Sequence, residues 1–300
     1  MSKWQVGFRD SASVIVTAHA KPCRLRLTLA GLVGQEYGGA LELIVVADGA
    51  STEVFDVLGE YQKYCSNLRV LESPGLGRAG ARNLGADNAK GHWLVFVDDD
   101  ILLRSDFVFQ HMRCQQLHPG LVKGRLREII GLTDVEDPAQ GGVGCRPVEE
   151  EILRNGLWSH DGIRVVSNAL EQAAERQEGF QAPWLASAGA NLSISRANWQ
   201  VCGGFDERYG KSWGLEDIDF GYRVYRAGIE IFICEQALGL HMSHPQENRW
   251  QQQDKNWRRF LSNDDSPEVQ ALPALLAEEG SVAKFTEAVH QIRQQAVSPC

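Results

Sequence analysis

The sequence of 300 residues is 43% hydrophobic and 23% charged, which are the proportions of an ordinary soluble globular protein. Its formal net charge of −9 repels phosphate backbones, which excludes nucleic acid as an expected partner but not a nucleotide in one local pocket. Seven cysteines, none in C-x-x-C spacing, argue against a zinc ribbon or a redox pair and favour reduced thiols in a cytoplasm.

Short apolar runs rich in β-branched residues alternate with helical patterns through the first third of the chain. These runs predict buried strands at Ser13–Ala18, Leu41–Ala47, Leu68–Leu71 and His92–Val97. The alternation predicts parallel βαβ units with right-handed crossovers. Ligands of such sheets collect at the carboxyl ends of the strands, where Thr17, Asp48 and the triplet Asp98, Asp99 and Asp100 stand.

The rest of the chain is less regular. Residues 121–130 predict another strand, and residues 131–180 are interpreted as an insertion or lid with one helical pattern near Val165–Arg176. Strand character resumes at Trp184–Ser195 and at Ile229–Ile233, with a helical pattern at Glu216–Ala227 between them. Polar, amphipathic helices follow. We therefore expect one domain over residues 1–245 and a C-terminal helical extension over residues 246–300.

The glycines Gly75, Gly77 and Gly80 spell G-x-G-x-x-G between a predicted strand and a predicted helix. This spacing is the dinucleotide-binding fingerprint, and Asp98 follows about 20 positions later, as the fingerprint requires. Three features count against NAD: two βα units come first, the acidic position is a triplet, and Arg78 and Arg82 add charge to the loop. The alternative is that the glycines only make a turn and let a helix pack closely.

The triplet Asp98-Asp99-Asp100 is a stronger signal. Three adjacent carboxylates at a strand end repel one another unless a cation lies among them. Mg²⁺ and Mn²⁺ are held by one or two carboxylates together with substrate phosphates. The triplet therefore predicts a divalent-cation site, and the alternative is a solvated acidic turn.

Several longer stretches carry a resemblance to a known family. VIVTAHAK, IVVADGAST, GRAGARNLGADNAKGHWLVFVDDDILL, and ASAGANLSISRANW followed by GGFDE and WGLEDIDFGYR resemble glycosyltransferase family 2 on the α/β GT-A fold. The similarity runs from about Ser13 to His244. Its second half resembles the galactosyl- and N-acetylgalactosaminyl-transferring branches in particular.

The resemblance implies a fold and an activity. It implies a Rossmann-like nucleotide-sugar-binding half at residues 1–104, with a mostly parallel sheet, and an acceptor and catalytic half at residues 181–245. The activity implied is a metal-dependent, inverting transfer of a hexose or N-acetylhexosamine from a UDP-sugar to an acceptor hydroxyl, in glycan or glycoconjugate biosynthesis. The cofactor implied is Mn²⁺ or Mg²⁺. The sequence does not identify the acceptor, which is a glycan, a lipid-linked molecule, a peptide or a small molecule.

The resemblance also assigns residues to the donor. Those expected to bind the nucleotide or its sugar are Thr17, Ala18, His19, Asp48, Arg78, Arg82, Asn83, Asp98, Asp99, Asn191, Trp213 and Gly214, with Arg196 near the donor as well. Asp48 would accept a hydrogen bond from the base. One of the two arginines would offset phosphate charge. Trp213 would stack on a sugar ring, although any tryptophan can belong to a core.

Catalytic and metal-binding roles follow from the same resemblance. Asp217 would be the base that takes the proton of the acceptor hydroxyl, and Glu216 would orient a sugar. The alternative is that these acids only stabilise a helix N-terminus, which would also lower the pKa of a carboxylate. Asp98 and Asp100 would bind the cation together with His241, for which His244 is the substitute.

Two other functions stay open at this point. A catalytically silent sugar-nucleotide-binding protein would keep every motif, and an NAD-dependent oxidoreductase would use the glycine loop. No leader is expected, because MSKWQVGFRD contains no apolar core. No run approaches the roughly 20 apolar residues of a membrane span. We expect a cytoplasmic protein without an integral membrane segment, and peripheral membrane contact stays open.

Overall fold

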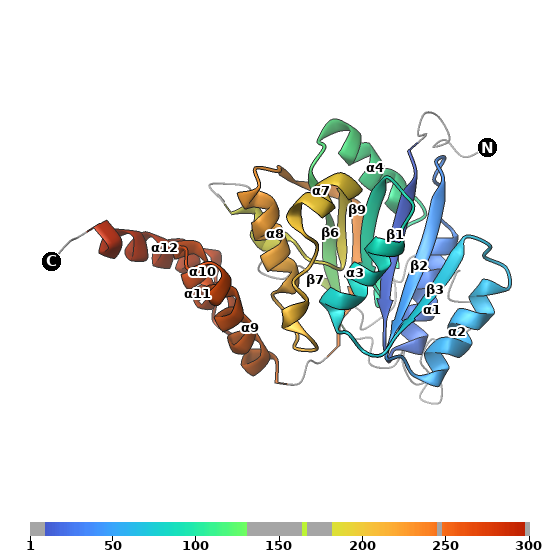
Figure 1. The fold of residues 1–300 in the computed structure, drawn as a ribbon, viewed down its shortest axis with the longest axis horizontal. Coiled ribbons are helices and arrows are strands. Elements are labelled where there is room, and N and C mark those ends of the chain that lie inside the picture. Colours follow the sequence, from blue (N-terminus) through green and yellow to red (C-terminus); the bar gives the residue numbers. More distant parts are fainter. Residues whose placement is uncertain (1–9, 131–163, 167–181, 245–247, 298–300) are drawn as a thin grey trace.

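A computed structural model describes residues 10–130, 164–166, 182–244 and 248–297. In this part of the chain nine strands form one sheet in the order β3-β2-β1-β4-β8-β6-β9-β5, with β7 paired to β6 (Figure 1). The strands are β1 (Ala12–Ala18), β2 (Leu41–Asp48), β3 (Leu68–Ser73), β4 (Trp93–Asp98), β5 (Ile101–Leu103), β6 (Leu121–Ile130), β7 (Arg164–Val166), β8 (Asn191–Ser195) and β9 (Ile231–Met242).

The first four strands are parallel, as the alternation of apolar runs predicts. Thr17 on β1 is opposite Val46 on β2 and Asp98 on β4, so the polar strand ends meet at one edge of the sheet. Beyond β4 the sheet is mixed: β8 runs antiparallel to β4 and to β6, whereas β6 and β9 are parallel. Only the first half of the sheet is therefore parallel throughout.

Helices cover both faces of the sheet because successive residues of each strand point to opposite sides. One face packs against α1 (Pro22–Val33), α2 (Thr52–Gln62) and α4 (Phe107–Leu117), and the other against α3 (Arg78–Asn88), α7 (Arg196–Cys202) and α8 (Glu216–Arg226). Val14 and Ile15, which are neighbours on β1, belong to these two different clusters.

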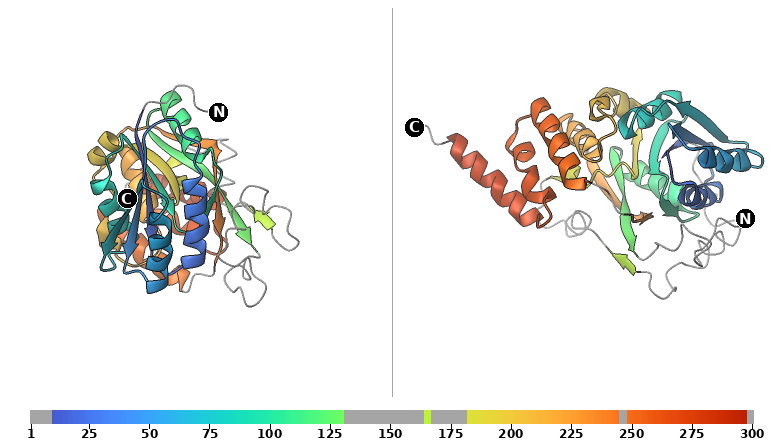
Figure 2. Two further views of the ribbon diagram at one scale, coloured as in Figure 1. Left: turned by 90° about the vertical axis from the view of Figure 1, so that its right-hand side faces the viewer. Right: turned by 90° about the horizontal axis from the view of Figure 1, so that it is seen from below.

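The C-terminal helices α9 (Arg249–Asn263), α10 (Pro267–Gln270), α11 (Leu272–Leu276) and α12 (Val282–Val297) extend from the sheet on the side of α8 (Figures 1 and 2). They share a third hydrophobic cluster with α8 and the 3₁₀ helix η4 (Pro183–Ala186). In it the rings of Trp184 and Tyr222 lie 4.9 Å apart and those of Tyr222 and Phe260 lie 5.5 Å apart. The helices of the extension are therefore present, while the domain boundary at 245 stays a prediction.

Three sequence-based expectations differ from the structure. Residues 164–166 form strand β7 rather than a helix, because they pair with the end of β6; the remainder of the 131–180 segment lies outside the described residues. Trp184 lies in η4, so strand character begins only at Asn191. The strand predicted at 229–233 continues to Met242, because its second half pairs with β5 and β6. Among the described residues, no helix has both the length and the apolar character needed to cross a bilayer.

Candidate active site

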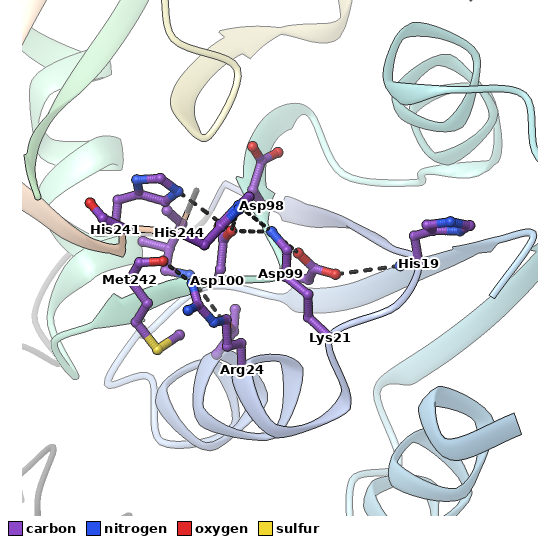
Figure 3. A network of polar contacts seen from close by, with 12 residues as sticks. His19, Lys21, Arg24, Asp98, Asp99, Asp100, His241, Met242 and His244 are labelled. Carbon is purple, nitrogen blue, oxygen red and sulfur yellow. Dashed lines mark hydrogen bonds and ion pairs between the residues drawn. The ribbon is translucent and has the colours of Figure 1, made fainter. Parts of the chain in front are cut away.

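The aspartate triplet turns the chain from β4 into β5, and its three side chains point in different directions (Figure 3). Asp98 Oδ1 accepts a hydrogen bond from Arg82 Nη2 at 2.8 Å. Asp99 Oδ2 accepts one from the backbone N–H of His19 at 3.4 Å, and burial, followed by the charge of Asp100, raises the pKa of Asp99 to about 7. Asp100, which is 3% exposed, points toward two histidines.

Asp100, His241 and His244 offer ligand atoms that all lie within 4.8 Å of one another. The Nε2 atoms of both histidines lie 3.4 Å from Asp100 Oδ2. Strand pairing produces this cluster, because β5 and β9 are antiparallel with Ile101 opposite His241, and the N–H of Met242 donates to the carbonyl of Asp100 at 2.9 Å. The structure therefore brings both candidate histidines together with Asp100.

Glu128 on β6 fixes the orientation of His241. Its Oε2 atom lies 2.6 Å from His241 Nδ1, which leaves Nε2 directed at Asp100. Burial alone would lower the pKa of His241, but its hydrogen bonds with Asp100 and Glu128 raise that pKa to about 10. A carboxylate on the outer nitrogen of a histidine is the usual support of a metal-binding imidazole.

The side chain of Lys21 lies inside this cluster (Figure 3). Its Nζ atom is 2.6 Å from Asp100 Oδ2 and 2.7 Å from His244 Nε2, so the ammonium stands where a cation bound by these groups would be. Asp100 Oδ1 is buried and has no hydrogen-bond partner among the described residues. One carboxylate and two imidazoles form a mixed O and N donor set that fits Mn²⁺ better than Mg²⁺, which prefers oxygen. Asp98 lies outside the cluster and contacts Arg82 instead.

Arg82 connects the two acidic motifs of the sequence. The guanidinium is 2% exposed; Nη2 donates to Asp98 and Nη1 donates to Glu216 Oε1 at 2.9 Å. Burial alone would lower the pKa of Arg82, but the two carboxylates raise it above its ordinary value. Arg82 Cζ lies over the ring of Phe205, 5.3 Å from the centre of that ring. Asp98 at the end of β4 and Glu216 at the start of α8 are therefore joined through one buried guanidinium.

Asp217 lies beside this arginine at the N-terminus of α8. Its two carboxylate oxygens accept hydrogen bonds from the backbone N–H groups of Gly189 at 3.0 Å and Ile218 at 2.9 Å. A helix N-terminus lowers the pKa of a carboxylate, yet burial and the charge of Glu216 outweigh Arg82 and raise the pKa of Asp217 to about 6. Glu216 is 3% exposed, and its Oε2 atom has no partner among the described residues.

The segment that leads into α8 has an unusual backbone. Gly214 and Leu215 both have left-handed dihedral angles, with φ of 90° and 73°. Such a conformation is unfavourable for leucine and is found mostly where the surrounding structure enforces it. Trp213 is half-buried, and the guanidinium of Arg249 lies 4.8 Å from the centre of its ring.

Several residues expected at the donor are hydrogen-bonded within the protein. The carboxylate of Asp48 accepts from Ser73 Oγ and from the backbone N–H groups of Leu76 and Gly77, at 2.5 to 2.8 Å. Asn83 Nδ2 donates to the carbonyl of Phe205 at 2.9 Å, whose own N–H donates back to Asn83. These side chains shape the loops around the site.

Asn191 and Arg196 also serve the fold. The Asn191 amide group, fully buried, donates to the carbonyls of Arg125 and Ala237. Arg196 donates to carbonyls at the end of α3 and beyond it, including that of Gly91 at 2.9 Å. By contrast Arg78, at the start of α3, is half-buried and has no ion pair within the described part of the chain.

At the carboxyl end of β1 the predicted residues differ in exposure. Ala18 is buried, Thr17 is half-buried and His19 is exposed. His19 Nδ1 lies 2.7 Å from the carbonyl oxygen of Asp48, which joins the ends of β1 and β2. His19 is the one of these three side chains that reaches solvent most fully.

The glycine loop packs against another loop of the chain. A Cβ atom on Gly77, which has φ of 83°, would lie 2.0 Å from the carbonyl oxygen of Gly210. The space over Gly77, where the fingerprint would place a pyrophosphate, thus holds the backbone of Gly210 and Lys211. This supports the interpretation of the glycines as a turn that permits close packing.

The sequence analysis missed three residues of the site: Lys21, Glu128 and Gly189. Lys21 stands within the family-like stretch VIVTAHAK, but only the fold brings its long side chain to His244, just past the end of β9. Glu128 lies in a strand that was predicted, yet nothing local indicates its pairing with His241. A Cβ atom on Gly189 would lie 2.5 Å from Arg82 Cζ, so glycine leaves room for the guanidinium there.

Two family models match the chain. Residues 13–135 match glycosyl transferase family 2, and residues 172–245 match the N-terminal domain of galactosyltransferase. A validoxylamine A glucosyltransferase of Streptomyces hygroscopicus subsp. limoneus is 27% identical over 245 residues, which cover 77% of this chain and 51% of that protein. The chain spans between about half and two thirds of the length of the first curated relatives that it matches.

Solved structures with the same fold include a mannosyltransferase from Pyrobaculum calidifontis in complex with GDP-Man and Mn²⁺. Its TM-score is 0.58 at 13% sequence identity, and the alignment covers 97% of this chain and 71% of the mannosyltransferase chain. Staphylococcus aureus TarS 1–349 in complex with UDP-GlcNAc has a TM-score of 0.56 at 16% sequence identity, and the alignment covers 96% of this chain and 73% of the TarS chain. The predicted GT-A fold is therefore confirmed.

Proposed function

We propose that this protein is a metal-dependent, inverting glycosyltransferase, because residues 13–135 match the glycosyl transferase family 2 model and the chain has the GT-A fold. It transfers a hexose or N-acetylhexosamine from a UDP-sugar to an acceptor hydroxyl. The match of residues 172–245 to a galactosyltransferase domain supports this donor class, as does the UDP-GlcNAc complex of the similar TarS structure.

One observation carries the proposal: buried Arg82 holds Asp98 and Glu216 together. Its two hydrogen bonds, both shorter than 3 Å, bring the end of β4 and the start of α8 into one site. A transfer between two substrates requires that the donor-binding and acceptor-activating groups face each other at close range. If the aspartate triplet and the Glu216-Asp217 pair lay far apart, the donor and the acceptor could not meet in one site.

Asp217 is suited to act as the base. Its pKa of about 6 means that it is deprotonated at neutral pH yet basic enough to accept a proton as the acceptor hydroxyl attacks. The N–H groups of Gly189 and Ile218 hold the carboxylate in place. Glu216 Oε2, buried and without a partner among the described residues, is suited to accept a hydrogen bond from a sugar hydroxyl.

The cation would be held by Asp100, His241 and His244, with Glu128 supporting His241. When bound, such an ion offsets the negative charge that develops on the departing diphosphate. Arg78, half-buried at the N-terminus of α3, adds a positive charge at the edge of the sheet where the strand ends meet. The glycine loop keeps its role in packing.

The test is release of UDP from a panel of UDP-hexoses and UDP-N-acetylhexosamines, with Mn²⁺ or Mg²⁺ and a panel of sugar acceptors. We expect turnover with at least one UDP-sugar, and its loss with EDTA. The Asp217→Asn variant should lose turnover while UDP and Mn²⁺ still raise its melting temperature, because a ligand that binds the folded state stabilises it.

The same experiment separates the alternatives when GDP-mannose is added to the donor panel and NAD to the ligands of the melting measurement. Faster turnover of GDP-mannose than of every UDP-sugar would contradict the donor class. Stabilisation by UDP and Mn²⁺ without turnover of any donor would indicate a silent sugar-nucleotide-binding protein. Stabilisation by NAD alone, with no effect of metal, would favour the oxidoreductase and overturn the proposal.

A further inference from the structure

Helix α9 contacts the backbone of the segment that precedes Glu216 and Asp217. Gln252 Oε1 accepts a hydrogen bond from the N–H of Trp213 at 2.7 Å. Asn256 Nδ2 donates to the carbonyls of Trp213 at 3.1 Å and of Gly214 at 2.7 Å. Because Gln252 and Asn256 are four positions apart, they lie on the same face of the helix.

These contacts fall on the part of the backbone that needs support. Gly214 and Leu215 are left-handed, and Leu215 is the N-cap residue of α8. A leucine in this conformation persists only when its surroundings enforce it. Gln252 binds the N–H of Trp213, and Asn256 binds the carbonyls of Trp213 and Gly214. These are the last backbone groups before the left-handed Leu215.

The helix that makes these contacts is itself firmly anchored. Asn256 is 1% exposed, and one turn further along α9 Phe260 is also 1% exposed within the hydrophobic cluster that contains Trp184 and Tyr222. The amide of Asn256 is thus held in a fixed place relative to α8. The two hydrogen bonds of the buried Asn256 amide fix the position of the backbone that it binds, because a shift of either carbonyl would leave a buried polar group without a partner.

We propose that Gln252 and Asn256 are positioning residues that set where Glu216 and Asp217 stand. The proposal rests on the function proposed above for Asp217. It gives the C-terminal helices a role in the reaction: α9 completes the acceptor side of the site without contacting the reacting atoms. The chain would thus form a competent base only when α9 is packed in place.

Paired variants of Gln252 test the proposal. Gln252→Met removes the acceptor for the N–H of Trp213 and keeps the length of the side chain, whereas Gln252→Glu retains an acceptor oxygen. We expect Gln252→Met and Asn256→Ala to lower kcat by about 10- to 100-fold, the range expected for a small misplacement of a catalytic group. The dissociation constant of UDP with Mn²⁺ should stay within about twofold, and Gln252→Glu should restore most of kcat.

The control is Arg258→Gln on the same helix. Arg258 is 69% exposed and pairs with Asp254 on the outer surface, so kcat should not change. Hydrogen exchange of the amides of residues 212–217 provides a readout that does not require turnover. It should accelerate in Gln252→Met and Asn256→Ala, and stay unchanged in the control.

The outcomes are distinguishable. Wild-type protein that releases no UDP contradicts the proposed function, while the exchange rates still test whether α9 holds the segment. Normal kcat in Gln252→Met, or unchanged exchange of residues 212–217, would overturn the positioning role. So would a loss of UDP binding equal to the loss of kcat, because that would indicate general damage. If Asn256→Ala does not fold, the comparison of Gln252→Met with Gln252→Glu decides alone.

Discussion

Replacing Arg82 by glutamine should destabilise the fold, because it leaves Glu216 buried without a positive partner. Breaking a buried ion pair by removing one member costs about 3–5 kcal/mol. The Asp98 side chain is 25% exposed and can be hydrated, whereas that of Glu216 is 4% exposed, so we expect the lower end of that range. With an unfolding entropy of about 2.1 cal/mol/K per residue, a loss of about 3 kcal/mol lowers the melting temperature of this chain by about 5 °C.

The assay is urea and thermal unfolding of Arg82→Gln beside Arg258→Gln. The second variant breaks an exposed pair, in which Arg258 is 69% and Asp254 54% exposed, and should unfold like the wild type. Adding Glu216→Gln to Arg82→Gln removes the unpaired charge and should recover part of the loss, as a double-mutant cycle measures. If Arg82→Gln unfolds within about 1 kcal/mol of the wild type, the bridge does not hold the two motifs together as described.

Three further predictions concern titration and the cation site. Because burial and Glu216 raise the pKa of Asp217 to about 6, kcat/KM should fall as the pH falls through about 6; a flat profile over pH 5–8 would contradict its role as base. Lys21→Met should bind Mn²⁺ more tightly than the wild type, by paramagnetic resonance of free Mn²⁺, because the ammonium no longer competes at Asp100; weaker binding would show that Lys21 supports the ion. Burial lowers the pKa of His111 to about 4, below its unfolded value of about 6.5, so the folded state takes up fewer protons and stability is lost as the pH falls between these values. His111→Gln should flatten that part of the stability curve, and an unchanged slope would contradict this assignment.

The first half of the fold, β1 to β4 with their helices, could be predicted because its information is local. Each of β1, β2 and β4 contains an uninterrupted run of buried apolar residues, and their carboxyl ends follow from the order of the elements. The prediction weakened where pairing is long-range. The second half of β9, Ala237–Met242, contains the polar residue His241, and only its neighbours β5 and β6 make it a strand.

The candidate site divides in the same way. Residue types at strand ends indicated Asp100 and the two histidines, because their chemistry is visible in the sequence. The partners of charged side chains within the protein were not visible. Arg82, one of the two arginines expected to offset phosphate charge, pairs with two carboxylates, and Asp48, expected to bind the base, accepts hydrogen bonds from the following loop. Long flexible side chains contact residues that are distant in the sequence, so their partners can be identified only from the tertiary structure.

The aromatic cluster of Trp184, Tyr222 and Phe260 has a consequence for how the molecule is divided. The galactosyltransferase family match ends at residue 245, between the second of these side chains and the third. Truncation at residue 245 would expose Trp184 and Tyr222 to water, and the exposed apolar surface would promote association. The end of this family match thus falls inside a shared hydrophobic cluster, so we expect truncations designed from it to yield insoluble fragments.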